Sequence, residues 1–438
     1  MAGSRPNQTR SLANAGAGPN KGLPQNTMEA PMLSPLSGYK VLDMSRILAG
    51  PWAGQTLADL GADVIKIERP GEGDDTRKWG PPYLSDNNGK STTETAYYLS
   101  ANRGKRSLTV DISSPEGQAI IKKLAIQSDV LIENYKVGGL KKYHLDYDSL
   151  RTINPKLVYC SITGFGQTGP YQQRAGYDFM IQGMGGLMSI TGQPDEVKGG
   201  GPVKVGVAVA DLFTGLYASI AIQAALLERV KSGLGQHIDM ALLDSQVAML
   251  ANQASNHLVG AELPARLGNA HPNIVPYQAF AASDGFIILA VGNNRQFRQF
   301  CELAGQPELA DQPEYASNSE RVKNRATLCA IVAGLEVQNS AAFWLKELSE
   351  RGVPCGPINS IDQVMADPQV KHRNMRTQIK HPLNDALELV GSPIKLSRTP
   401  VNTIKPPPLL GQHNEEILRE LGYSEAQISR LQTDGCIA

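Results

Sequence analysis

The sequence has few of the features that mark disulfide-stabilised, metal-binding or nucleic-acid-binding proteins. Its five cysteines are odd in number and widely spaced, and they form no CxxC or Cys-His pattern: Cys160, Cys301, Cys329, Cys355 and Cys436. We therefore expect reduced thiols in an intracellular protein and no metal site. Lys plus Arg and Asp plus Glu each number 42, so net charge gives no reason to expect DNA, RNA or an anionic membrane as a partner.

Motifs of several large enzyme classes are also missing. The sequence has neither a GxGxxG motif nor a Walker A motif, which removes the usual sequence support for binding dinucleotides or nucleoside triphosphates. It has no GxSxG motif of a serine hydrolase. No apolar run reaches the roughly 18 to 20 residues of a membrane span, since polar residues and glycine interrupt the nearest candidate, 212–227. These absences favour a soluble protein with a site for a small molecule.

Residues 1–36 have the composition of a disordered leader. They are rich in Gly, Pro, Asn and Ser, contain no acid before Glu29 and lack the apolar core of a secretory signal. We expect a cytoplasmic protein. A transit peptide, and with it the mitochondrial matrix, is an alternative because acids are scarce, although the many Gly and Pro residues oppose an amphipathic helix. An over-extended gene start is another, since Met28 and Met32 lie directly before the first patterned segment.

The patterned sequence predicts an α/β fold. A strand at 40–43, a turn at Gly50-Pro51, a helix at 52–60 with Gly61 as its C-cap, and a strand at 64–67 form a βαβ unit, whose strands are parallel. Strands at 107–111, 130–133 and 157–162 and a helix at 115–127, capped by Ser114, repeat the pattern. A long apolar helix from Asp211 to about Arg229 is expected in the core. A parallel or mixed sheet covered by helices follows.

Basic residues follow three of the predicted strands. Ligands of open α/β sheets bind outside the carboxyl ends of the strands, where these side chains gather. They could hold the phosphates of a bulky anionic cofactor: Arg46, Arg69, Arg77, Lys78, Lys136, Lys141 and Lys142. The alternative is that most of them are solvated surface charges, as most Lys and Arg residues are.

Asp178 is the strongest candidate for a nucleophile. It follows Gly176-Tyr177 and precedes a long apolar run that contains several glycines. In a closed site a carboxylate can attack an activated acyl group and divide acyl transfer into easier steps. The alternative is a helix N-cap, the commoner role for an aspartate at such a boundary. The two roles are compatible, because a helix N-terminus keeps a carboxylate ionised.

Two weaker features also allow two interpretations each. The backbone N–H groups of residues 161–166 could stabilise an oxyanion, but a tight glycine turn explains the same sequence equally well. His271 could be an acid or base, although a lone loop histidine is more often structural.

Several segments, taken in chain order, resemble those of the class III CoA-transferases, the CaiB/BaiF family, over about residues 36–438. The segments are Leu48-Ala49-Gly50-Pro51, Val64-Ile65-Lys66-Ile67-Glu68-Arg69-Pro70-Gly71, Glu133-Asn134-Tyr135, Ser161-Ile162-Thr163-Gly164-Phe165-Gly166-Gln167, Arg174-Ala175-Gly176-Tyr177-Asp178 and Pro407-Pro408-Leu409-Leu410-Gly411. The resemblance implies a Rossmann-like large domain plus a smaller α/β domain, in an interlocked homodimer of two ring-like subunits. We place the large CoA-binding domain at 37–255, the small domain at 256–360, and a return arm with C-terminal helices packing on the large domain at 361–438.

The same resemblance implies roles for individual residues. Asp178 falls on the catalytic aspartate of the family, and Arg69 and Asn134 fall on positions that contact CoA. We take Arg46, which follows the first strand, as a further candidate for CoA binding.

Four positions differ from the formyl-CoA transferase branch of the family. Lys142 stands where an arginine contacts CoA, and Thr163 and Phe165 stand where a lysine and a tyrosine help to hold the ligand. Leu48 stands where a glutamine helps in catalysis. We keep Lys142, Thr163 and Phe165 as candidates for binding CoA, and we expect another acyl pair in place of oxalate or formate.

Residues 73–82 and 271–280 look most like members of the family that move CoA from succinyl-CoA to glutarate or a similar dicarboxylate. The implied reaction passes through an aspartyl anhydride and an aspartyl-CoA thioester. CoA and acyl-CoA are substrates, and neither a tightly bound cofactor nor a metal is implied. Arg46, Arg103 and Arg106 are hypotheses for the cation that binds the distal carboxylate of the acceptor.

Three other functions remain open from the sequence. An α-methylacyl-CoA racemase has the same fold but typically carries histidine where this chain has Tyr177. A non-catalytic CoA-binding protein would use Asp178 only as a helix cap. A dehydrogenase is less favoured because its glycine motif is absent.

Overall fold

Six parallel strands form the central sheet of the computed structural model, which describes residues 34–401 and 405–438. They are β1 (Lys40–Asp43), β2 (Asp63–Glu68), β5 (Lys105–Thr109), β6 (Val130–Glu133), β7 (Val158–Thr163) and β8 (His237–Ala241). Their order is β5-β2-β1-β6-β7-β8, and every neighbouring pair is parallel. From β1 the strands continue through β2 to the edge strand β5, and from β6 they continue through β7 to the opposite edge strand β8. This is the strand order of a Rossmann-type sheet. The predicted α/β fold is confirmed.

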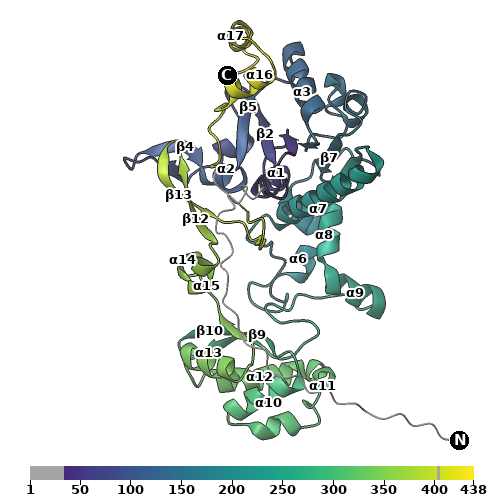
Figure 1. Ribbon diagram of the computed structural model, residues 1–438. Helices are drawn as coiled ribbons and strands as arrows, with labels where there is room; N and C mark the ends of the chain where they lie inside the picture. Colours follow the sequence, from purple (N-terminus) through teal and green to yellow (C-terminus); the bar gives the residue numbers. More distant parts are fainter. Residues whose placement is uncertain (1–33, 402–404) are drawn as a thin grey trace, which may run out of the picture.

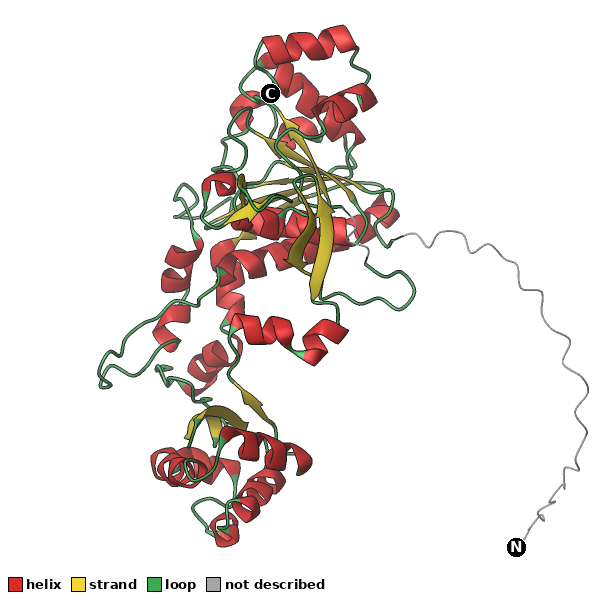
Figure 2. Ribbon diagram, turned by 90° about the vertical axis from the view of Figure 1, so that its left-hand side faces the viewer, coloured by secondary structure: helices red, strands yellow, loops and turns green. Residues whose placement is uncertain are grey.

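Helices cover both faces of this sheet, as Figure 2 shows. On one face α1 (Ala49–Asp59) and α7 (Val209–Ser232) pack against residues such as Val41 and Ile132. On the other face the buried cluster joins Leu42 and Ile67 to α3 (Pro115–Gln127), α16 (Asn414–Glu420) and α17 (Glu425–Thr433). Strands buried on both faces explain the continuous apolar runs in the sequence.

The local signals for the first elements were mostly correct. Gly61 has φ +102° after α1, and the Ser114 side chain accepts a hydrogen bond from the Gly117 N–H with proline next to it at the start of α3. The turn expected at Gly50-Pro51 is wrong, because both residues lie in the first turn of α1, where proline is tolerated. Strand β8 was not predicted, since it is a half-exposed edge strand of only five residues.

A second α/β unit has a core of its own, at the bottom of Figure 1. Its antiparallel sheet has the order β11-β10-β9 and is covered by helices. The elements are β9 (Tyr277–Ala282), β10 (Gly285–Ala290), β11 (Cys355–Pro357), α10 (Asn294–Leu303), α11 (Asn318–Lys323), α12 (Arg325–Glu336) and α13 (Ala341–Glu350).

After this unit the chain returns to the large sheet. The Arg77 guanidinium donates to the Pro408 carbonyl at 3.0 Å, and the His413 N–H donates to the Ser107 carbonyl at 3.1 Å. The Asn414 carboxamide oxygen accepts from the Thr109 N–H at 2.9 Å. Helices α16 and α17 therefore end the chain beside the edge strand β5, at the top of Figure 1.

The remaining elements are short. They are β3 (Tyr83–Ser85), β4 (Ser91–Thr95), α2 (Ala96–Ala101), α4 (Tyr147–Leu150), α5 (Asp178–Met184), α6 (Leu187–Ile190), α8 (Leu242–Met249), α9 (Ala251–Gly260), α14 (Ile361–Ala366), α15 (Pro368–His372), β12 (Arg376–His381) and β13 (Asn384–Val390).

Helix α7 is only partly a core helix, contrary to the prediction from its sequence. Its inner face, including Ala218 and Ile222, is fully buried, whereas Ile220, Leu227 and Val230 are 62%, 70% and 77% exposed. By length and composition alone α7 could also cross a membrane. One face of α7 packs on the sheet, and its other face is an exposed apolar surface.

Candidate functional site

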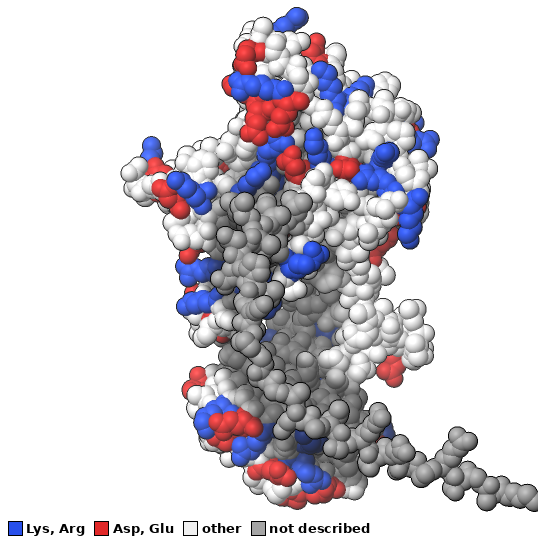
Figure 3. Space-filling view, in the orientation of Figure 1, with Lys and Arg blue, Asp and Glu red and all other residues white. Residues whose placement is uncertain are grey.

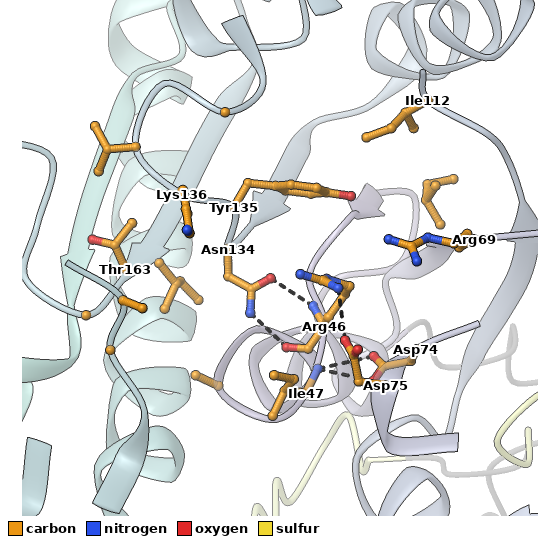
Figure 4. A pocket seen from close by; sticks show the side chains of 18 of the residues that line it. Arg46, Ile47, Arg69, Asp74, Asp75, Ile112, Asn134, Tyr135, Lys136 and Thr163 are labelled. Carbon is orange, nitrogen blue, oxygen red and sulfur yellow. Dashed lines mark hydrogen bonds and ion pairs between the residues drawn. The ribbon is translucent and has the colours of Figure 1, made fainter. Parts of the chain in front are cut away.

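A cavity opens at the carboxyl ends of the parallel strands, where the strand order reverses between β1 and β6. It has a volume of about 760 Å³, within the usual range for a small-molecule site. The loops after β1, β2, β5, β6 and β7 contribute to its wall, together with residues 172–177, Asp211 and Leu242. Figure 4 shows part of this wall.

Most of the residues proposed to bind CoA line this cavity. Arg46, Arg69, Asn134, Lys142 and Thr163 belong to its wall. Phe165 does not; its ring lies 5.5 Å from that of Tyr171 and under the guanidinium of Arg174.

Not all of the predicted phosphate-binding cations reach the cavity. Lys78 and Lys136 line it, whereas Lys141 lines a smaller cavity of about 240 Å³ on the other side of the same loop. The prediction for Arg77 is wrong. Its side chain is buried and donates to Glu68 at 2.7 and 2.9 Å and to Glu94 at 3.1 Å. The guanidinium carbon of Arg77 also lies 3.6 Å from the centre of the Tyr98 ring. Arg77 therefore has a structural role, connecting Glu68, Glu94 and Tyr98.

The loop after β1 is tied to its neighbours by backbone hydrogen bonds (Figure 4). The Arg46 N–H donates to Asn134 Oδ1 at 2.9 Å, and Asn134 Nδ2 donates to the Arg46 carbonyl at 2.7 Å. The Ile47 N–H donates to Asp74 at 3.2 and 3.3 Å. Ile47 has φ +72°, a conformation that costs a β-branched residue about 1 to 3 kcal/mol. The loop therefore keeps one strained shape at the cavity wall.

A buried ion pair fixes the acid that holds this loop. Lys66 Nζ lies 2.9 Å from Asp74 Oδ2, and both side chains are fully buried. Lys66 Nζ also donates to the Ser45 carbonyl at 2.9 Å. Burial opposes ionisation of Asp74, but the Lys66 ammonium and the N–H and hydroxyl of Thr76 outweigh it and lower the pKa of Asp74. Asp74 therefore stays a carboxylate and a strong acceptor for Ile47.

The guanidinium groups at the cavity mouth are exposed and only loosely held. Arg46 lies 3.0 Å from Asp75, and Arg69 lies 2.9 Å from Glu72. Such exposed pairs are worth at most about 1 kcal/mol, so a phosphate can replace the carboxylate.

Asp178 is the first residue of α5 and is held by two donors. Its Oδ1 accepts from the Ala210 N–H at 2.8 Å, and its Oδ2 accepts from Gln182 Nε2 at 2.7 Å. Gln182 in turn accepts from the Val205 N–H at 2.8 Å. The N-cap of α5 is Tyr177, and no side chain caps the helix. The helix-cap interpretation of Asp178 is therefore wrong, and the carboxylate has a fixed orientation beside the cavity.

Sequence reasoning missed Asp211 as a site residue. It lies in the first turn of α7 and lines the cavity. Burial, and then the charge of Asp178, raise the pKa of Asp211 to about 7. Acids are common in the first turn of a helix, so the position of Asp211 in the pattern did not mark it as a site residue.

Arg174 was also missed as a site residue. It lines the cavity, and its guanidinium carbon lies 5.3 Å from the centre of the Phe165 ring and 4.8 Å from that of Tyr171. Within residues 34–401 and 405–438 it has no carboxylate partner, so its charge is free to bind an anion. Its place four residues before Asp178 was the available signal.

Two of the three arginines suggested for the distal carboxylate are in the wrong place. Arg103 is buried and donates to both oxygens of Asp59. Arg106 donates to Asp63 and to two glutamates of α16, Glu416 and Glu420. Both arginines connect structural elements outside the cavity wall.

Part of the turn after β7 is structural, because side chains accept from two of its N–H groups. The Gly166 N–H donates to Thr163 Oγ1 at 3.0 Å, and the Gln167 N–H donates to Asp239 at 2.9 and 3.1 Å. These two N–H groups are therefore not available to an oxyanion. His271 is likewise structural: its Nδ1 accepts from the Asn273 N–H at 3.1 Å, away from the cavity.

The arrangement suits acyl transfer from a large anionic thioester. Cations line the cavity, and the oriented carboxylate of Asp178, which is not itself a lining residue, follows directly after the lining residue Tyr177. In the part of the chain that the structure describes, no three His, Cys, Asp or Glu side chains gather as metal ligands would.

Comparisons with known proteins agree with this geometry. The sequence profile of CoA-transferase family III matches residues 36–414. A succinate–glutarate CoA-transferase of Agrobacterium fabrum is 52% identical over 387 residues, which cover 88% of this chain and 96% of that protein. The human succinyl-CoA:glutarate CoA-transferase is 45% identical over 428 residues, 97% of this chain and 95% of that one. The crystal structure of a CaiB/BaiF family protein from Brucella suis has 51% identity and a TM-score of 0.78, and covers 89% of this chain and 100% of that one.

Proposed function

Because the chain belongs to CoA-transferase family III, we propose that it moves CoA from succinyl-CoA to glutarate by covalent catalysis at Asp178. The observation that carries the mechanism is the carboxylate of Asp178, held by the Ala210 N–H and Gln182 beside a cavity with cations at its mouth. The substrates are proposed from the relatives that act on succinyl-CoA and glutarate and match nearly the whole chain.

CoA binds with its phosphates at the cavity mouth. Arg69 and Arg46 exchange their exposed carboxylate partners for phosphate oxygens, and Lys142 adds a third cation. Asn134 fixes the loop that carries Arg46. The thioester then extends inward, toward Asp178.

The reaction exchanges one thioester for another in balanced steps. An oxygen of Asp178 attacks the succinyl carbonyl carbon, and the C–S bond breaks to release CoA thiolate and leave a mixed anhydride. The thiolate attacks the aspartyl carbonyl, so that succinate leaves with its electron pair and an aspartyl-CoA thioester remains. Glutarate repeats these steps in reverse, and glutaryl-CoA leaves. No net proton, electron or external energy source is consumed.

Recognition of the acceptor needs a cation for the second carboxylate of glutarate. Arg174 fits this role because it lines the cavity, lacks a carboxylate partner among the described residues and is held by two aromatic rings. Arg46, suggested from the sequence, also lines the cavity but is better placed for the phosphates, next to Asn134.

The active form is proposed to be a homodimer with interlocked subunits. Helix α9 has no buried residue in the single chain, and apolar side chains continue along α7, α8 and the loop after α9. In Figure 3 the surface over α8 and α9 carries almost no charge. The exposed apolar residues are Phe213, Leu216, Ile220, Leu227, Val230, Val247, Leu258, Val259 and Leu263. A second copy of the chain would remove this apolar surface from water.

The location stays a proposal as well. The cytoplasm is expected, with the mitochondrial matrix as the alternative if residues 1–36 are a transit peptide; residues 1–33 lie outside the described part of the chain.

The test is to incubate the purified protein with succinyl-CoA and glutarate and to measure glutaryl-CoA by mass spectrometry. Wild-type protein should form glutaryl-CoA and Asp178→Ala should not. A racemase would instead introduce deuterium from heavy water beside the thioester of a 2-methylacyl-CoA, without CoA exchange. That result, from folded protein, would overturn the proposed function.

A further inference from the structure

A second carboxyl group, that of Asp211, lines the cavity next to the residue that holds Asp178. Asp178 begins α5, and Asp211 lies in the first turn of α7. Ala210, the neighbour of Asp211 in the chain, donates its N–H to Asp178 at 2.8 Å. The start of α7 therefore holds the nucleophile and at the same time places a second carboxyl group in the cavity wall.

Asp211 has nothing to stabilise a negative charge. In residues 34–401 and 405–438 its side chain has neither a hydrogen-bond nor an ion-pair partner. Among the described arginines that line the cavity, Arg46 is paired with Asp75 and Arg69 with Glu72, and Arg174 packs against the rings of Phe165 and Tyr171; none of these pairs with Asp211.

The ionisable groups that face Asp211 are also acidic. They are Asp178 on α5 and Tyr97 on α2. Burial and the charge of Asp178 raise the pKa of Asp211 to about 7, and burial with the two aspartates raises the pKa of Tyr97 to about 12. Burial and the neighbouring negative charge both favour the protonated form of Asp211.

We propose that Asp211 acts in its neutral form, as the hydrogen-bond donor to the thioester carbonyl oxygen while Asp178 attacks the carbonyl carbon. This inference deepens the proposed function and rests on it. The bond from Asp178 Oδ to carbon forms as the carbonyl π pair moves to oxygen, and the C–S bond then breaks as the carbonyl re-forms. Asp211 keeps its proton throughout.

A neutral acid suits this reaction better than a charged one. An ionised Asp211 would repel the incoming carboxylate, the oxyanion and the CoA thiolate, all of which are negative. The turn after β7, which the sequence suggested for this role, has two of its N–H groups engaged by Thr163 and Asp239. A donor fixed in the protein costs no reorganisation during the reaction, and removing one such donor typically lowers kcat about 10² to 10³-fold.

The experiment measures exchange of ¹³C-labelled succinate into succinyl-CoA between pH 5.5 and 9, which needs no glutarate. The kcat of wild-type protein should fall as pH rises above about 7, because Asp211 loses its proton there. Asp211→Asn keeps a donor and has no titrating proton, so its kcat should stay within about 10-fold of the wild-type value at pH 6 and should not fall. Asp211→Ala should lose about 10² to 10³-fold at every pH.

Glu133→Gln is the matched control. Burial raises the pKa of Glu133 to about 7, the same value. Glu133 lines the smaller cavity, and its Oε2 accepts at 2.8 Å from the N–H of Tyr135, a residue of the CoA site wall. This variant should change KM for succinyl-CoA and keep the fall of kcat with pH. If kcat of Glu133→Gln no longer falls as pH rises, the titrating group is Glu133 and not Asp211, and the proposal is overturned.

Two further outcomes would also contradict it. A wild-type kcat for exchange that does not depend on pH would exclude a titrating donor, whether or not the variants fold. A kcat of Asp211→Asn that falls with pH as the wild-type value does would exclude Asp211 as the titrating group. Exchange in the wild type without transfer to glutarate would instead refute the proposed acceptor and leave the role of Asp211 intact. No exchange at any pH would refute CoA transfer itself.

Discussion

Gly164 and Gly176 touch through their backbones. A Cβ atom on Gly164 would lie 2.6 Å from the Cα of Gly176, and one on Gly176 would lie 2.3 Å from the Cα of Gly164. No side chain fits between the end of β7 and the segment that leads to Asp178. The contact between these two glycines brings segment 161–167, at the end of β7, next to segment 174–178, which carries the nucleophile.

Gly176→Ala should reduce transfer strongly, because the new methyl group must push the Asp178 segment away from β7. We expect kcat to fall at least about 10²-fold, since misplacement by about 1 Å has that effect on oriented reactants. Gly183→Ala is the control in α5, the helix that follows, where a Cβ would meet only Met188 Sδ at 3.7 Å. It should keep activity and stabilise α5 by about 0.5 to 1 kcal/mol. Equal activity in both variants would show that the close contact does not position Asp178.

Ile47→Gly should make the protein more stable than Ile47→Ala. Both variants remove the side chain, but alanine keeps the cost of φ +72° and glycine does not. The difference in free energy of unfolding, measured by chemical denaturation, should be about 1 to 2 kcal/mol in favour of glycine. A more stable alanine variant would mean that Asp74 does not impose the left-handed conformation on this loop.

Arg174→Ala should weaken recognition of the acceptor. Loss of a charge-assisted contact of about 1.5 to 3 kcal/mol predicts a KM for glutarate that is about 10 to 100-fold higher. The KM for butyrate, which lacks the second carboxylate, should change little, and Arg174→Lys should restore part of the affinity for glutarate. Steady-state kinetics with both acceptors decides this, and an equal rise of KM for glutarate and butyrate would exclude Arg174 as the cation for the distal carboxylate.

Glu336 should make stability depend on pH in the unit formed by β9–β11 and α10–α13. Its side chain is fully buried, both carboxyl oxygens lack a hydrogen-bond partner, and burial raises its pKa from 4.5 to about 8. A raised pKa means that the folded protein binds a proton that the unfolded chain releases. The stability contributed by protonated Glu336 is therefore fully present below about pH 4.5 and is lost as pH rises to about 8.

Glu336→Leu removes this titration. Between pH 5 and 8 the free energy of unfolding of the wild type should fall by up to about 4 kcal/mol more than that of the variant. Denaturation curves of both proteins at each pH measure the difference. If the free energies of unfolding of the wild type and of Glu336→Leu change with pH in parallel, Glu336 in solution is either exposed to water or paired with another group.

Sequence patterns were sufficient for the sheet and for the outline of the site. Buried parallel strands such as 64–67 and 130–133 are mostly apolar, and the loops after such strands carry Arg46, Arg69 and Asn134 into one cavity. These features depend on local sequence and on the topology of parallel sheets, both of which can be derived without coordinates.

The errors concern side chains whose partners are distant in sequence. Arg77 and Arg106 looked like ligand-binding cations until the structure placed Glu68 and Glu420 beside them. Asp211 and Arg174 depend on tertiary placement in the same way. Helix α7 looked fully buried because its sequence is apolar all round, and an apolar face toward a partner has the same composition as one toward a core.

The central claim is covalent catalysis at Asp178, and peptide mass spectrometry tests it directly. Wild-type protein and Asp178→Asn are incubated with succinyl-CoA without acceptor, quenched in acid and digested. The peptide that contains Asp178 should carry the mass of CoA in a thioester, or a hydroxamate after trapping with hydroxylamine, in the wild type only. Transfer of CoA to glutarate without any modification of this peptide, or with the modification on another carboxylate, would contradict the account.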